Sequence, residues 1–271
     1  MKTLEKHLLI LEPLLAELAP LGWFRKGREL WFVDRKEGYA LCIHTEMYMD
    51  GTYKNVFVHY GSFWNDVKAG PYGVSLGSSY WLDCHSCIPF DTVRFETAEE
   101  LESIVRRSAP ILVDAMKESV LPILRTIRDL PSFVAASGQL DKLLKLYNKM
   151  WRRTQVWDYF ALGRPEDAMA HLDRLIEPWP WRELYLANLA KRSPEEQEKR
   201  RSQVLKDIEK MEAIERENCA QLAAYRAEIA AIPPEEMPRV LQERRAASEA
   251  ALAAHLGPRR WKALAPPSAP A

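Results

Sequence analysis

Cysteine is scarce in this sequence, and neither a long apolar run nor an excess of one charge stands out. The 271 residues include 4 cysteines, too few for a disulfide scaffold at this length, so we expect a reducing, cytoplasmic location. No stretch approaches the roughly 20 apolar residues of a membrane span, and the first residues do not resemble a signal peptide. Basic and acidic residues number 38 each, and this balance argues against a dedicated nucleic-acid or membrane binder.

Glycine is also sparse, and its distribution separates two kinds of sequence. Nine of the 11 glycines lie before residue 139, together with alternating aromatic and β-branched segments. The second half is rich in Ala, Leu, Glu, Lys and Arg, which favour helix. We therefore predict an α+β domain over 1–135, a helical domain over 139–257 and a disordered tail over 258–271.

The first half combines helical and strand periodicities. Leucines between residues 4 and 18 recur at spacings of four and three, which predicts an amphipathic helix. Asp50-Gly51 is a strong hairpin signal, and Thr97 with Glu100 matches a capping box that opens a helix. The strands are predicted over 29–35, 39–49, 53–60 and 74–83. We expect an antiparallel β-meander of about four strands with helices packed on one face.

The second half is predicted to contain one very long helix, from Pro194 to about residue 232. Residues 204–232 of this helix carry a coiled-coil-like apolar seam. Because such seams pair helices, we consider a homodimer formed through residues 204–232. A further helix over 238–256 would complete a long helical hairpin. The seam positions alternate by four and three residues: Val204, Ile208, Met211, Glu215, Asn218, Leu222, Tyr225, Ile229 and Ile232.

The Cys-x-x-Cys pair Cys84 and Cys87 is the candidate for metal chemistry. Cys42 and His44 offer a second pair of ligands, because alternate residues of a strand project from the same face. Thiolates and imidazole in tetrahedral array suit Zn²⁺. The alternative function is therefore a metal-dependent or hydrolytic enzyme built on these residues, whereas Cys42 as a small buried apolar residue is the structural interpretation.

The string Gly73-Val74-Ser75-Leu76-Gly77 matches the nucleophile-elbow pattern, in which a serine sits on a strand-to-helix turn. The residues after it are typical of a strand, so we interpret the string as a glycine-rich sheet edge. Without a coherent catalytic constellation, we predict a non-catalytic protein-binding module that uses no cofactor.

Aromatic residues crowd the predicted strands and the loop over 61–73. Large aromatics dominate small α+β cores, but strand alternation also turns some of them away from the helices. An exposed aromatic face would bind a protein partner or the helical half. The candidate binding residues are Trp31, Tyr48, Tyr53, Tyr60, Trp64 and Trp81, with Arg25 and Arg28 beside them.

Two short stretches resemble known families. The opening Leu21-Gly22-Trp23-Phe24-Arg25-Lys26-Gly27-Arg28, followed by Leu30-Trp31-Phe32 and later by Val74-Ser75-Leu76-Gly77, resembles the bacterial domain-of-unknown-function family 4304. That resemblance implies an α+β domain over about residues 4–135 and, through relatives near toxin–immunity loci, an immunity role.

Separately, residues 159–168 resemble the helix-turn-helix junction of a tetratricopeptide repeat. Because no second copy follows, this resemblance predicts a single helical hairpin here.

Overall fold

A computed structural model describes residues 2–65, 67–70, 73–76, 78–83, 97–143 and 152–264. The chain folds into two compact units: residues 1–147 together with 239–271 form unit 1, and residues 148–238 form unit 2. The predicted division placed 139–257 in one helical domain. The contacts instead assign the last helices to unit 1, because their apolar residues complete its core.

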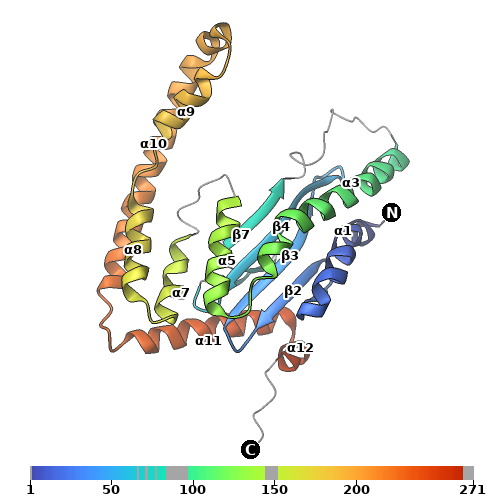
Figure 1. Cartoon of the computed structure of the whole chain (residues 1–271), viewed down its shortest axis with the longest axis vertical. Coiled ribbons are helices and arrows are strands. Elements are labelled where there is room, and N and C mark those ends of the chain that lie inside the picture. The colour runs from blue at the N-terminus through green and yellow to red at the C-terminus, as the bar shows by residue number, and fades with distance from the viewer. Residues whose placement is uncertain are drawn as a thin grey trace, which may run out of the picture. The chain divides into compact units, whose positions relative to one another are not determined.

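Unit 1 is built on a five-stranded antiparallel sheet of order β1-β2-β3-β4-β7 (Figure 1). A separate pair, β5 with β6, lies outside this sheet. The strands are β1 Phe24–Lys26, β2 Glu29–Asp34, β3 Tyr39–Met47, β4 Tyr53–Ser62, β5 Lys68–Gly70, β6 Gly73–Ser75 and β7 Ser78–Asp83. The helices are α1 Thr3–Leu18, η1 Ala19–Leu21, α3 Ala98–Ser119, α4 Leu121–Leu124, α5 Leu130–Leu143, α11 Met237–Leu256 and α12 Pro258–Ala263. The α+β class is confirmed.

The local signals of the sequence place the turns and caps of unit 1. Gly51 has φ +86° in the β3–β4 hairpin, a left-handed conformation that favours glycine, and Asp50 Oδ1 accepts the Thr52 N–H at 2.8 Å. Thr97 and Glu100 form the predicted capping box at the start of α3. Ser75 lies in β6, which pairs with β5, so the Gly73–Ser75 string belongs to a β-hairpin and not to a strand-to-helix elbow.

Helices α1, α3 and α5 cover one face of the sheet, as expected (Figure 1). Leu30, Leu41, Ile43 and Val58 point toward them and are buried. The Tyr53 hydroxyl also donates a hydrogen bond to the Lys6 carbonyl oxygen of α1. Burial of these apolar side chains is the main stabilising contribution on this side.

The opposite face is covered over part of its length by α11 and α12, as the sequence allows for the helical half. A buried cluster forms there between the sheet and α11, and its strand residues are Trp31, Val33, Ala40 and Cys42. The α11 contribution consists of Leu252 and Leu256, and Trp261 of α12 packs against the cluster. Strand alternation makes this second face apolar near the β2–β3 turn, so it needs its own helical cover.

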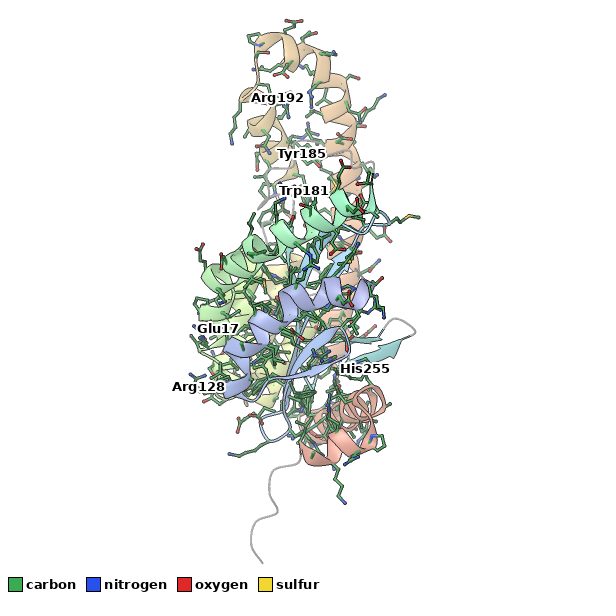
Figure 2. The ribbon with its side chains drawn as sticks, turned by 90° about the vertical axis from the view of Figure 1, so that its right-hand side faces the viewer. Glu17, Arg128, Trp181, Tyr185, Arg192 and His255 are labelled. Carbon is green, nitrogen blue, oxygen red and sulfur yellow. The ribbon has the colours of Figure 1, made fainter. Side chains whose placement is uncertain are left out.

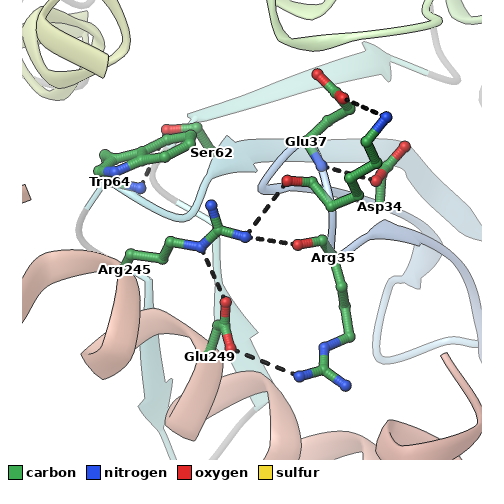
Figure 3. A network of polar contacts seen from close by, with 8 residues as sticks. Asp34, Arg35, Glu37, Ser62, Trp64, Arg245 and Glu249 are labelled. Atoms are coloured by element: carbon green, nitrogen blue, oxygen red, sulfur yellow. Dashed lines mark hydrogen bonds and ion pairs between the residues drawn. The ribbon is translucent and has the colours of Figure 1, made fainter. Parts of the chain in front are cut away.

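A polar network centred on Arg245 fastens α11 to the β2–β3 turn (Figure 3). Its guanidinium donates from Nη2 to the Arg35 carbonyl at 2.6 Å and from Nε to Glu249 Oε1 at 3.0 Å. The same group lies 5.4 Å from the ring centroid of Trp64, a cation–π distance. The network orients α11, while the apolar cluster stabilises its position.

Unit 2 is helical, with η2 Arg153–Gln155, α7 Val156–Ala161, α8 Pro165–Ile176, α9 Trp181–Ala190 and α10 Pro194–Ala230. Gly163, at φ +68°, lies in the turn between α7 and α8, and Pro165 occupies the first turn of α8. α10 runs along α8 and α9, which precede it in the sequence (Figure 1). The sequence predicts residues 238–256 as the second helix of the long hairpin, whereas the structure assigns α11 to unit 1. None of the helices in the described ranges combines the length and apolarity that crossing a bilayer requires.

Candidate binding surfaces

Three of the predicted binding residues are core residues of unit 1. Trp31, Tyr53 and Tyr60 are each 1% exposed. Trp31 lies under α11, and the other two point toward α1 and its neighbours. This placement corrects the expectation that they form a surface, because the predicted aromatic face is largely consumed by packing within the chain.

The side chains of Tyr48, Trp64, Arg25 and Arg28 are more accessible than those three. Tyr48 is exposed and has the Lys54 ammonium 5.9 Å from its ring centroid, whereas the half-buried Trp64 stacks with Arg245. Arg25 and Arg28 are exposed near the β1–β2 turn, where Arg25 Nη1 donates to the Gly27 carbonyl. Trp81 lies in β7, where its backbone pairs with that of Phe57 in β4.

The predicted metal ligands are only partly described. Cys42 and His44 lie on one face of β3, as their alternation predicts, but Cys84 and Cys87 fall outside the described residues. Burial raises the pKa of the Cys42 thiol, which disfavours the thiolate that a metal requires. Within the described ranges no three His, Cys, Asp or Glu side chains are grouped so as to hold a metal ion. The zinc site stays a prediction.

A stack of three rings, which the sequence reasoning missed, occupies the sheet face next to Cys42. His44 lies 4.7 Å from His59 and 5.0 Å from Phe57, measured between ring centroids, and all three rings are nearly parallel. The register pairs Cys42 with His59 and His44 with Phe57. Alternation could have placed each residue on a face, but only the β3–β4 register brings the rings together.

The stacked imidazoles are held neutral. Burial, together with the adjacent His44, lowers the pKa of His59 to about 3. Burial likewise lowers the pKa of His44, although Glu29 and Glu46 oppose the shift. A neutral, half-buried stack is a packing element of the sheet.

The predicted seam of α10 faces helices of its own chain. Ile208, Glu215, Leu222 and Ile229 are its buried positions, and α8 and α9 cover them. The Glu215 carboxylate accepts the Trp179 backbone N–H at 2.9 Å, and the Trp181 indole N–H lies 3.5 Å away. A homodimer through residues 204–232 would therefore have to displace α8 and α9.

The α9–α10 arm, defined as residues 181–216, leaves aliphatic side chains outside that seam. On α9, Trp181, Tyr185 and Leu189 face α10, and Figure 2 shows Trp181, Tyr185 and Arg192 following one another along the arm. Leu184 and Leu186 lie on either side of this stripe, 39% and 40% exposed. Leu205 and Ile214 of α10 are each 39% exposed. The arm thus exposes large apolar side chains on a helix pair whose seam is already packed.

Comparisons of the chain with protein-family models, curated proteins and solved structures find no match. The resemblance to family 4304 accordingly stays a prediction.

Proposed function

We propose that the chain is a non-catalytic protein-binding module and that the α9–α10 arm carries its binding surface. The observation that supports this proposal is the exposure of four large aliphatic side chains, Leu184, Leu186, Leu205 and Ile214, beside a filled seam. Covering such side chains is favourable by about 25 cal/mol for each Å² of apolar surface removed from water.

The occupant that best fits this surface is an amphipathic helix of another protein. A helix pair buries one stripe on each helix, and a third helix laid along one side of the pair can cover the aliphatic side chains that flank the seam on that side. Charged pairs such as Arg182 with Glu212, 3.2 Å apart across the arm, would lie at the rim of that interface. Apolar anchors with a charged rim are the usual anatomy of a protein–protein contact.

The identity of the partner is a separate part of the proposal. The resemblance to family 4304 favours a bacterial toxin as the partner, in a cytoplasmic complex that blocks the toxin's active site. The proteins encoded beside this gene are therefore the first candidates to test.

The experiment measures binding of each neighbouring gene product to the full chain by isothermal titration calorimetry. We expect one of them to bind, and the double variant Leu184→Ser/Leu186→Ser to weaken that binding by about tenfold or more, as interface anchors do. Ile111→Ser is the matched control, because Ile111 is a 42% exposed aliphatic residue of α3 in unit 1. Binding that survives the arm variant unchanged, or that none of the gene products shows, would overturn the proposal.

A further inference from the structure

A cavity of about 340 Å³ lies in unit 1 at the end of the sheet where β2 and β3 meet η1 and α4. Its aromatic wall consists of Trp23, Phe32 and Tyr39, and leucine and isoleucine side chains complete it. Trp23 and Phe32 have ring centroids 5.9 Å apart, and Phe32 and Tyr39 have theirs 5.8 Å apart. A concave, mostly apolar space with few polar groups is the usual form of a small-molecule site.

Two opposite charges, Asp34 and Arg128, also line this cavity. Arg128 Nη1 donates to the Ile127 carbonyl at 2.7 Å, and a guanidinium has further N–H donors that can meet a carboxylate. Asp34 Oδ1 accepts the Glu37 N–H at 2.9 Å, which leaves carboxylate acceptor sites for another donor. The lining thus offers one cationic and one anionic contact beside an aromatic wall.

The electrostatics of Tyr39 agree with this arrangement. Burial raises the pKa of its hydroxyl, the Asp34, Glu37 and Asp129 carboxylates raise it further, and the Arg128 guanidinium opposes the shift. The wall is therefore neutral and feels the negative charge of Asp34. A ligand group that approaches Asp34 must be cationic to gain from that field.

We propose that this cavity binds a free α-amino acid with a large apolar side chain, with its carboxylate on Arg128, its ammonium on Asp34 and its side chain against Trp23, Phe32 and Tyr39. The volume of the cavity is at the lower end of the usual range for ligand pockets, which suits an amino acid better than a nucleotide cofactor. The zwitterion carries one group of opposite sign for each of these two charged residues. This site is separate from the α9–α10 arm.

The test titrates the full chain with L-tryptophan, L-phenylalanine and L-leucine in the calorimeter. We expect saturable binding of at least one of them. N-acetyl-L-tryptophan lacks the ammonium and L-tryptophanamide lacks the carboxylate, so each should bind about tenfold more weakly than L-tryptophan or worse, as expected for a lost charged hydrogen bond.

Two variants test which charged group of the amino acid each of the two protein residues contacts. Arg128→Ala should abolish the preference for the acid over the amide, and Asp34→Asn should abolish the preference for the free amine over its acetylated form. Asn at position 34 keeps a carbonyl that can accept the Glu37 N–H, so the turn is preserved. Arg125→Ala is the matched control, since Arg125 is an exposed residue that pairs with Glu17. No saturable binding of any of the three amino acids, or unchanged preferences in both variants, would overturn the proposal.

Discussion

Glu29 of β2 and His255 of α11 are joined by a 3.0 Å contact between Oε2 and Nε2, although 226 residues separate them in the sequence. The same carboxylate accepts the Trp31 indole N–H at 2.8 Å. Burial would raise the pKa of Glu29, but the hydrogen bonds from Trp31 and His255 more than offset it, and the pKa lies below its usual value. His255, labelled in Figure 2, lies in the last turn of α11, so this contact fixes the end of the helix that covers the second sheet face.

We therefore expect Glu29→Gln to lower the free energy of unfolding of the full chain. The change replaces a charged acceptor by a neutral amide at a half-buried site, which costs about 1–3 kcal/mol. Urea unfolding followed by tryptophan fluorescence measures it. Glu243→Gln is the control on the same helix, because Glu243 is exposed and pairs only with its helical neighbour Arg239 in the described network. Equal unfolding midpoints for the two variants would show that the Glu29–His255 contact does not stabilise the protein.

The stability of unit 1 should fall as the pH decreases below neutral. Burial, with smaller contributions from Arg28 and His44, lowers the pKa of His7 to about 4, and burial with His44 lowers that of His59 to about 3. In the unfolded chain these imidazoles titrate near 6.5, so between about pH 6.5 and 4 the unfolded state binds protons that the folded state does not. Each group then removes about 1.4 kcal/mol of stability per pH unit.

Urea unfolding at a series of pH values between 7 and 4 tests this dependence. His7→Gln is the informative variant, because its amide can still contact Thr45 Oγ1, the partner of the His7 ring, but does not titrate. We expect the variant to show a shallower loss of stability than the parent chain. Parallel pH profiles for the two proteins would contradict the assignment to His7.

The sequence predicts which face of an element is buried better than it predicts what covers that face. The four-three spacing identifies Ile208, Leu222 and Ile229 as one buried stripe of α10, and the structure confirms this. The covering helices, α8 and α9, could not be inferred, because a periodic stripe fits any apolar partner of the right shape. For the same reason the sequence groups residues 238–256 with the helical half, although the apolar residues of α11 complete the core of unit 1.

The candidate sites are even harder to predict from the sequence than the helices that cover a buried face. Hairpin and capping signals are local, so Asp50-Gly51 and Thr97 are found where the sequence predicts them. The His44–His59 stack and the cavity beside Arg128 depend on strand register and on the packing of distant segments. No short motif encodes such contacts, since they form only when the whole unit folds.

Two leucines of α10 should differ strongly in their contribution to unit 2. Leu222 is 0% exposed, whereas Leu205 is 39% exposed. Leu222→Ala should destabilise the unit by about 2–5 kcal/mol, because it opens a cavity in a packed seam, and Leu205→Ala should have a much smaller effect. Hydrogen–deuterium exchange separates the units: we expect faster exchange over 152–238 in the first variant and unchanged exchange over 2–65. Similar exchange in both variants would mean that the seam does not hold α10 in place.

The full chain should not retain stoichiometric zinc after purification. A zinc site needs thiolate ligands, whereas Cys42 is a buried member of the apolar cluster under α11, and burial raises the pKa of its thiol. Elemental analysis of the protein, before and after dialysis against a chelator, measures the metal content. Stoichiometric zinc that is lost together with folding in Cys84→Ser would contradict this expectation and favour the metal-dependent enzyme. The variant Cys42→Ala then decides whether Cys42 is a ligand, because a ligand loss would release the metal, whereas a core substitution would leave it bound.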